Sequence, residues 1–183
     1  PSVEQFLDSA RAAGAREIIL LPNNPNVVAA ARQAATQDLR LHVVAARSIP
    51  QGIAALLAFS PEQSLQTNLD SMGNALASVT SLEVTNAVTS TTVGGLPVQE
   101  GQSVALTDGE LVAAADSPEE VLKLALAKAG LGPGALVTLY LGQQSNREEA
   151  QDLADQLRSE ADGVQVDLIY GGQPHYHYLA SLE

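Results

Sequence analysis

Two short runs of apolar residues constrain the fold of this chain more than any other feature. They are Ile18–Leu21 and Leu136–Leu141, the second interrupted only by Thr138, and each is followed by a Pro or a Gly. A continuous apolar run of this length is typical of a strand that is buried on both faces of a parallel sheet. Each run is followed by an amphipathic helix and a second strand, near residues 41–45 and 164–170. The sequence therefore predicts two strand–helix–strand units.

The segment between these units has a different pattern of residues. Ser60-Pro61-Glu62-Gln63 predicts a helix start, and apolar residues then recur every three or four positions as far as Val79. Residues 82–115 are rich in β-branched side chains broken by Gly pairs, which is typical of strands joined by tight turns. We predict an α/β protein with two small lobes, mainly parallel sheets and flanking helices. The predicted organisation is a first lobe at 1–60, a long connecting helix at 61–80, an antiparallel β insert at 81–116 and a second lobe at 117–183.

Composition excludes several classes of site. The chain has no Cys, so disulfides, thiolate nucleophiles and Cys-based zinc sites are excluded. Aromatic residues make up only 3% of the chain, so aliphatic side chains must fill its core. No apolar run reaches the roughly 20 residues of a membrane span, and no leader peptide opens the chain, so we expect a cytoplasmic location.

The charge is large and unevenly distributed. A net charge of −12 argues against nucleic acid as a partner, because phosphates are bound by Lys and Arg and the chain has only nine of these. Residues 1–60 carry five basic and four acidic side chains, whereas residues 61–183 carry four and seventeen. The first third is therefore suited to an anionic group or an acidic partner, or it is simply a nearly neutral surface.

Four loops are expected at the carboxyl ends of the predicted parallel strands, where α/β proteins bind ligands. They are Pro22–Asn26, Arg47–Gly52, Gly142–Asn146 and Gly171–Tyr176. Their amide side chains both donate and accept hydrogen bonds, although Asn and Gly are also ordinary turn residues, so a structural role stays open for each loop. The candidate binding residues are Asn23, Asn24, Asn26, Ser48, Gln51, Gly52, Gly171, Gly172, Gln173 and His175.

No catalytic or metal-binding constellation stands out. The sequence contains neither of the glycine-rich phosphate-binding fingerprints nor the glycine–serine–glycine elbow of hydrolases. His175 and His177 would share one face of an extended segment and could share a metal ion, but no third ligand is near in sequence. The alternative for this segment is an edge strand with polar and aromatic faces. His42 lies inside a predicted strand, where a packed, hydrogen-bonded histidine is the simpler interpretation.

Three segments carry a family resemblance. They are ILLPNNPN at residues 19–26, SIPQGIAALLAF at 48–59 and GGQPHY at 171–176. In this order they resemble the C-terminal domain of the ATP-binding subunit of bacterial fatty acid kinase, which belongs to a dihydroxyacetone kinase-like group. The resemblance covers essentially the whole chain, and it implies two α/β lobes similar to those of dihydroxyacetone kinase and of the DegV-type fatty acid carriers.

The resemblance also implies a division of labour. An N-terminal domain that this chain lacks would bind ATP and magnesium, and this domain would engage a separate carrier protein that presents a fatty acid for phosphorylation to acyl phosphate. The chain itself would then need no cofactor and would not be an enzyme alone, although it would be part of an ATP-dependent phosphotransferase of lipid metabolism. The histidine that captures the substrate of true dihydroxyacetone kinases cannot be matched to any histidine here.

Two alternatives stay open beside docking of a carrier. The chain could bind a small polyol of the dihydroxyacetone type, with His175 in the site. It could also be a dimerisation module, because the apolar seam formed by Leu65, Leu69, Met72, Leu76 and Val79 suits packing between protomers as well as within one.

Overall fold

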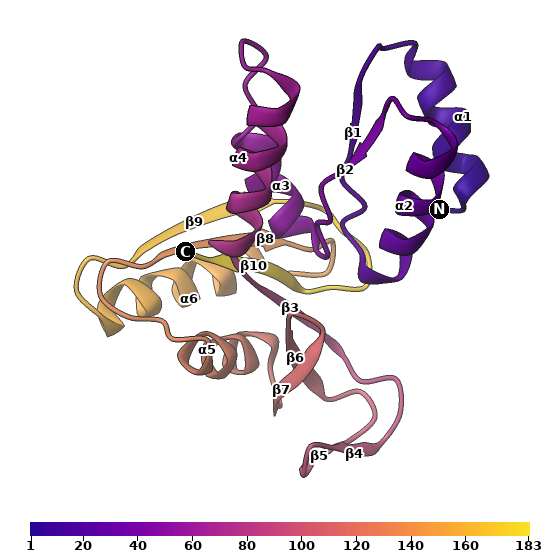
Figure 1. Cartoon of the computed structure of the whole chain (residues 1–183). Helices are drawn as coiled ribbons and strands as arrows, with labels where there is room; N and C mark the ends of the chain where they lie inside the picture. The colour runs from indigo at the N-terminus through magenta and orange to yellow at the C-terminus, as the bar shows by residue number, and fades with distance from the viewer. The chain divides into compact units, whose positions relative to one another are not determined.

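In the computed structural model, which describes residues 1–183, the chain divides at Val79 into two units (Figure 1). The first unit is Pro1–Val79 and the second unit is Thr80–Glu183. The first unit consists of α1 (Val3–Ala13), β1 (Ile18–Leu20), α2 (Pro25–Gln37), β2 (Leu41–Val43), α3 (Ile49–Leu57) and α4 (Leu65–Ala77).

The first unit is built around the parallel pair β1–β2, as the sequence predicts. Helices α1 and α2 pack on one side of this pair, where Leu7 and Ala34 meet Ile18 and Leu20. Helices α3 and α4 pack on the other side, where Met72 joins alternate residues of the same strands (Figure 1). Helices therefore cover both faces of the pair, which explains the continuous apolar sequence of β1.

Helix α4 begins later than the sequence suggests. Ser64 caps the helix by accepting a hydrogen bond from Thr67 N at 3.1 Å. Ser60, the predicted cap, is held instead by Asn68, whose Oδ1 accepts from Ser60 N and whose Nδ2 donates to Ser60 O, both at 2.8 Å. Asn68 is buried, so these bonds fix residues 60–64 as a turn on the helix and leave a helix from Leu65 to Ala77.

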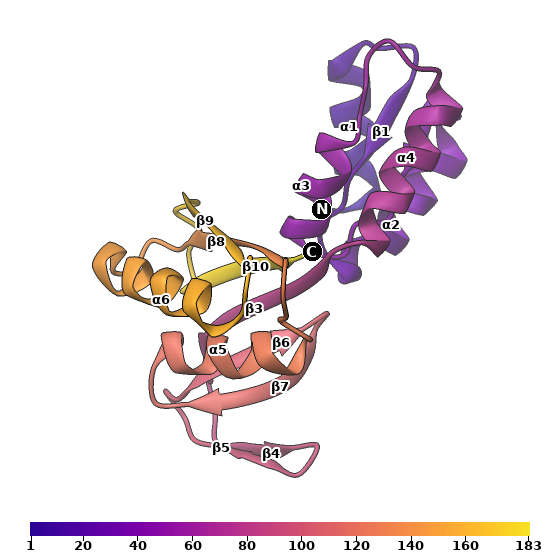
Figure 2. The ribbon, with the colours of Figure 1, turned by 90° about the vertical axis from the view of Figure 1, so that its left-hand side faces the viewer.

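The second unit contains one large sheet, one small hairpin and two helices. Its elements are β3 (Thr80–Asn86), β4 (Thr91–Val93), β5 (Leu96–Val98), β6 (Ser103–Thr107), β7 (Glu110–Ala115), α5 (Pro118–Lys128), β8 (Leu136–Leu141), α6 (Arg147–Glu160), β9 (Gln165–Tyr170) and β10 (Tyr178–Leu182). The sheet has the order β7-β6-β3-β10-β8-β9, and β4 and β5 form the separate hairpin. Figure 2 shows α5 and α6 beside this sheet.

The prediction of mainly parallel pairing is wrong for the second unit. Only β8 and β9 pair in parallel, and the other pairs in the sheet are antiparallel. The predicted antiparallel insert is also not separate, because β3, β6 and β7 belong to the same sheet as β8 and β9. The reason is β10, which lies between β3 and β8 and joins segments that are far apart in sequence.

The expectation of an edge strand around His175 is also corrected. Residues 178–182 form β10 at the centre of the sheet, and all five are buried. Both His175 and His177 precede this strand in a loop.

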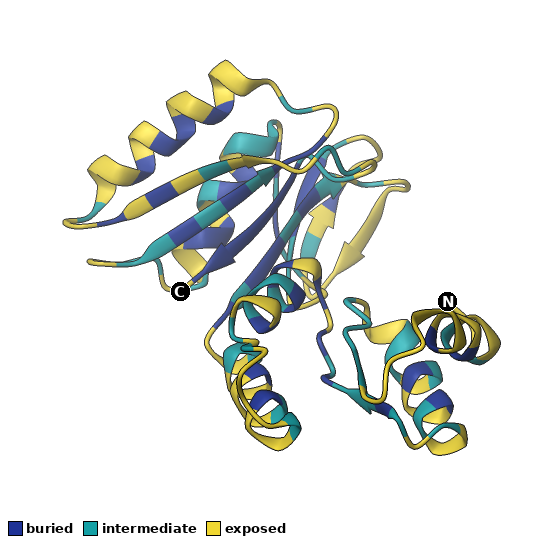
Figure 3. Ribbon diagram, turned by 90° about the horizontal axis from the view of Figure 1, so that it is seen from above, coloured by how far each residue is buried: buried dark blue, intermediate teal, exposed yellow.

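Helices α5 and α6 lie on the same face of the large sheet and share one core with it. Figure 3 shows that α6 turns its buried residues toward the sheet and its exposed residues to solvent, and the buried residues are Ala150, Leu153, Ala154 and Leu157. Across the chain, the helices are all too short or too polar to cross a bilayer.

Candidate functional site

The candidate loops gather in two clusters, one in each unit. The first loop cluster consists of the predicted loops Pro22–Asn26 and Arg47–Gly52, which follow β1 and β2. The second of them is shorter than predicted, because α3 begins at Ile49 and residues 49–52 form its first turn. Because these strands are parallel, their carboxyl ends lie at the same end of the pair, and the two loops meet there. Their contact is close: a β-carbon placed on Gly52 would lie 2.0 Å from Oδ1 of Asn23.

Helix capping accounts for most of the polar side chains in the first loop cluster. Asn24 caps α2, since its Oδ1 accepts from Asn26 N at 2.8 Å. Ser48 caps α3 by accepting from Gln51 N at 3.3 Å, and Gln51 Oε1 accepts from Arg47 N at 2.9 Å. These residues therefore hold the amino-terminal turns of two neighbouring helices in place.

Asn23 differs from its neighbours in the first loop cluster. Its Oδ1 is buried without a hydrogen-bond partner, and its backbone has a φ of 56°, in the left-handed region. Asn tolerates this conformation better than most residues. Asn23 is half-buried, and its Oδ1 is thus the buried polar atom of this cluster that helix capping does not explain.

The second loop cluster consists of Gly142–Asn146 and Gly171–Tyr176, which follow the parallel strands β8 and β9. The amide nitrogens of Gly171 and Gly172 both donate to Leu141 O at 3.0 Å. Gln173 ties the two loops together, because its Nε2 donates to Tyr140 O at 2.7 Å and its backbone oxygen accepts from Gln143 N at 3.1 Å. Gly and Gln in this cluster therefore shape the loop.

His175 projects from this loop. Its φ is 71°, its side chain is exposed, and its backbone oxygen accepts from Thr85 Oγ1 at 2.6 Å. His177 is separately engaged, with Nε2 3.0 Å from Asn86 Oδ1. No three His, Asp or Glu side chains of the chain gather as a metal site. In this cluster His175 is the predicted residue whose side chain is free to contact a partner.

A carboxylate next to the second loop cluster has an altered pKa. Burial raises the pKa of Glu83, and the negative charge of Asp108 raises it further. The phenol of Tyr176 donates a hydrogen bond to Glu83 and partly opposes this shift. Burial and the Glu83 charge in turn raise the pKa of Tyr176. Sequence analysis missed this group, because its three residues lie far apart in the chain.

Sequence analysis also missed an apolar surface at the end of α3. Leu56, Leu57 and Phe59 are all exposed, and Leu57 is 82% exposed. We call these three residues the α3 patch. The signal was present in the sequence, since IAALLAF at 53–59 has no polar side chain on any helical face.

The comparisons with known proteins decide the family. All residues, 1–183, match the family model for the C-terminal part of FakA-like fatty acid kinase proteins. The chain belongs to this family. Protein YloV of Bacillus subtilis is 32% identical over 184 residues, and an uncharacterized protein of Staphylococcus haemolyticus is 35% identical over 185. These relatives of the FakA-like chain are much longer: the whole chain is covered, but it spans only 33% of each.

Solved structures of DegV type share the fold of this family member. A DegV family protein from Corynebacterium glutamicum matches with a TM-score of 0.67 and 16% identity, covering 100% of this chain and 81% of that one. The Streptococcus pneumoniae fatty acid kinase B3 protein, loaded with linoleic acid, matches with a TM-score of 0.65 and 17% identity, covering 100% and 76%. The likeness establishes a mixed α/β fold in which sheets are flanked by helices.

Proposed function

We propose that this chain is the carrier-docking part of a fatty acid kinase. It binds a DegV-type protein that holds a fatty acid, while another part of the same kinase phosphorylates that fatty acid. The observation that carries this proposal is the match of all 183 residues to the C-terminal family of FakA-like fatty acid kinase proteins. Because the curated relatives are about three times longer, the remaining two thirds of such a protein leave room for a nucleotide-binding domain.

The proposed reaction takes place outside this chain. A carboxylate oxygen of the fatty acid attacks the γ-phosphorus of ATP, and the bond from that phosphorus to the bridging oxygen of ADP breaks. The products are acyl phosphate and ADP, with magnesium neutralising the phosphate charge. ATP and magnesium are held by the other part of the kinase, and this chain contributes by positioning the carrier.

The α3 patch supplies a surface suited to docking. Large exposed aliphatic and aromatic side chains that adjoin one another are typical of the centre of a protein interface. The patch lies at one end of α3, and the first loop cluster lies at the other end, about 13 Å away at 1.5 Å per residue. A single carrier surface can therefore contact both.

A titration of this chain with a fatty-acid-loaded DegV-type carrier from the same organism tests the proposal. We expect calorimetry to show binding of the carrier and no heat from ATP in a parallel titration. Leu57→Asp places a charge in the patch and should weaken binding at least tenfold. Leu39→Asp is the matched control, because Leu39 is 86% exposed in the same unit but lies outside the patch. A chain that binds no carrier, or that binds ATP, would refute the proposal.

A second candidate function is the binding of an apolar chain within the first unit. A cavity of about 460 Å³ lies beside β1 and is lined mainly by apolar side chains. Its lining residues are Glu17, Ile19, Leu21, Leu56, Phe59, Pro61, Gln63, Leu65, Asn68 and Met72. The only charged group among them is Glu17, which would repel a carboxylate, so this cavity favours a hydrocarbon tail over an acid head group.

Equilibrium dialysis with radiolabelled palmitate tests the second candidate separately. Retention that Leu65→Trp abolishes, with carrier binding unchanged, would support a lipid site. Absence of retention would remove this candidate and leave the docking proposal intact. The dimerisation hypothesis gains no support, because Leu69, Met72 and Leu76 of the apolar seam pack in the core of the first unit.

A further inference from the structure

The outer edge of β2 is an unpaired strand edge. In the parallel ladder, Ile18 N donates to Arg40 O at 2.8 Å and Val44 N donates to Leu20 O at 3.1 Å. Bonding alternates along a parallel strand, so His42 also faces β1, whereas Leu41 and Val43 direct their backbone groups away from it. Leu41 O and both backbone groups of Val43 have no hydrogen-bond partner in the chain. An open edge of this kind can accept another strand.

This edge lies in a slot between two helices. The slot has a volume of about 450 Å³, and we call it the β2 slot. Its lining residues are Arg32 and Ala35 of α2, Leu41, His42 and Val43 of β2 with Val44 and Ala45 that follow it, and Leu69, Gly73 and Leu76 of α4. All three residues of β2 and the two that follow it line the slot, so its long side is formed by this strand and its extension.

Gly73 gives the second observation. It lies in the interior of α4, where a glycine costs up to about 1 kcal/mol relative to alanine. No atom lies within 4 Å of the position that a β-carbon on Gly73 would occupy, and its φ is not in the left-handed region. The fold itself therefore has no need of a glycine here. Glycine is commonly used where a backbone and a ligand approach each other closely, and Gly73 leaves such a space in the wall opposite the strand edge.

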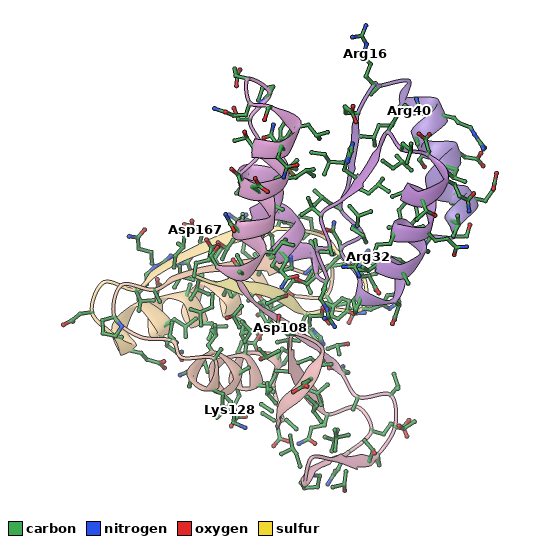
Figure 4. All side chains as sticks on the ribbon, viewed as in Figure 1. Arg16, Arg32, Arg40, Asp108, Lys128 and Asp167 are labelled. Atoms are coloured by element: carbon green, nitrogen blue, oxygen red, sulfur yellow. The ribbon has the colours of Figure 1, made fainter.

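The charge of the slot gives the third observation. Arg32 extends from α2, as labelled in Figure 4, is exposed, and forms no ion pair. Nearby, His42 Nε2 lies 2.6 Å from Glu17 Oε2, and Arg40 forms an ion pair with Asp38 at 2.6 Å. The slot thus presents one unmatched positive charge beside an apolar wall.

We infer that the β2 slot receives an extended segment of a partner polypeptide, which adds a third strand to the β1–β2 pair. The backbone of this segment bonds to Leu41 O and to both backbone groups of Val43. Its side chains are apolar toward α2 and toward α4, and a carboxylate lies opposite Arg32. This mode of recognition derives affinity from the main chain and specificity from the flanking side chains. The inference goes beyond carrier docking and does not depend on it.

The same charge argues against a second copy of this chain as the occupant. Two β2 edges paired about a twofold axis would bring two copies of Arg32 to the same interface, and the strand Leu41–Val43 carries no carboxylate to match them. A partner strand that carries Asp or Glu removes this repulsion.

The probe is a capped heptapeptide with four consecutive Val or Ile residues followed by one Glu, titrated into the ¹⁵N-labelled chain. We expect the amide of Val43 to shift and to become protected from hydrogen exchange. The same peptide with alternate backbone nitrogens methylated should bind at least tenfold more weakly, because strand pairing needs its N–H groups. Unchanged spectra at millimolar peptide, or equal binding of the methylated peptide, would overturn the inference.

Variants of the chain test the same inference from the protein side. Val43→Pro removes the outward N–H, which an edge strand tolerates, and Gly73→Leu fills the slot from α4, where the structure leaves space. Each substitution should abolish peptide binding. If Val43→Pro unfolds the protein, Gly73→Leu alone tests the inference. Arg32→Glu should shift the ratio of binding affinities at least tenfold toward the peptide with Lys in place of Glu.

If the chain forms a dimer and Gly73→Leu dissociates it, the occupant of the slot is a second copy of this chain and the partner assignment is overturned. Leu57→Asp should leave peptide binding unchanged. This variant therefore distinguishes a failure of the β2 slot inference from a failure of the carrier-docking proposal.

Discussion

Asn23 packs so closely on the first turn of α3 that a β-carbon on Gly52 would lie 2.0 Å from Asn23 Oδ1, 2.6 Å from its Cγ and 2.8 Å from its Nδ2. Asn23 lies in the loop after β1, and Gly52 lies in the first turn of α3, which follows β2. Their contact fixes the amino-terminal end of α3 against the left-handed turn at Asn23. The first loop cluster therefore has a single packed arrangement, and each residue constrains the other.

We predict that Gly52→Ala destabilises the protein by about 1–3 kcal/mol, which is typical of overpacking. The result is informative because alanine is normally the better residue inside a helix, by up to about 1 kcal/mol. Chemical denaturation monitored by circular dichroism measures the free energy of unfolding. A neutral or stabilising Gly52→Ala would show that the amide of Asn23 rotates away without cost.

The same substitution in an Asn23→Gly background supplies the control. Glycine keeps the left-handed turn at residue 23 and removes the amide that the new methyl group meets. There Gly52→Ala should become neutral or stabilising, and the double-mutant cycle then measures the coupling between residues 23 and 52. Additive effects would mean that Gly52 is required for another reason.

Much of the first unit was predictable from the sequence, because its order is local. The apolar run at Ile18–Leu21, the cap at Asn24 and the Pro that follows it specify a buried strand and a helix start without reference to distant residues. The start of α4 was mispredicted for the opposite reason. Ser60 has a good capping sequence, but a tertiary contact with the buried side chain of Asn68 overrides it.

Gly142→Ala should be among the most damaging substitutions of its size in the second unit. A β-carbon there would lie 1.8 Å from Tyr176 O and 3.1 Å from His177 O, and both are backbone atoms that cannot rotate aside. We expect a loss of about 3 kcal/mol, at the upper end for overpacking. Gly132→Ala is the matched control, because its nearest atom would be 3.7 Å away, and it should change stability by less than about 0.5 kcal/mol. Equal effects in thermal melts would contradict this account of the second loop cluster.

Glu83→Gln tests the raised pKa of Glu83. In the folded state this carboxyl holds its proton more tightly than its ordinary value of 4.5 allows, because of burial and the charge of Asp108. Its contribution to stability is therefore present at low pH and is lost as the pH rises from 4.5 through the raised value. Gln carries no charge and can still accept the hydrogen bond of Tyr176. We expect the variant to be more stable than the native protein at about pH 7 and equally stable below about pH 4.

Urea denaturation at intervals between about pH 3.5 and about pH 7.5 measures this difference directly. Asp108→Asn should reproduce part of the gain, since it removes the second cause of the shift. A stability difference that is independent of pH would assign the effect of Glu83→Gln to packing and would reject the electrostatic explanation.

The second unit shows where prediction from sequence stops. Each strand between Leu82 and Ala115 was expected as antiparallel, and the local turn signals Gly94-Gly95 and Asp108-Gly109 are sufficient for that. The place of these strands in a six-stranded sheet is set by β10, whose partners lie about 40 and 100 residues earlier in the chain. Neither a turn motif nor a hydrophobic period encodes such a pairing. The group formed by Glu83, Asp108 and Tyr176 follows from this pairing, so the sequence pattern could not predict it either.

His175→Gly is expected to separate stability from binding. The left-handed backbone at His175 costs a residue with a β-carbon about 1–2 kcal/mol of stability, and glycine avoids this cost. Glycine also has more conformational entropy in the unfolded chain, which offsets part of the gain. The variant should therefore be as stable as the native protein or more stable by up to about 1 kcal/mol. Under the docking proposal its affinity for the fatty-acid-loaded carrier should fall, because the exposed imidazole is the part of this residue that the fold does not use.

The control for this pair of measurements is Asp108→Gly, which changes the other left-handed non-glycine residue of the second unit, with a φ of 50°. It should leave carrier affinity unchanged, because Asp108 lies in the turn between β6 and β7 and not in the second loop cluster. A loss of stability in His175→Gly would show that the imidazole packs against the loop and has a structural role. A gain in stability with unchanged affinity would place the docking surface elsewhere, and the α3 patch would then be the region to test next.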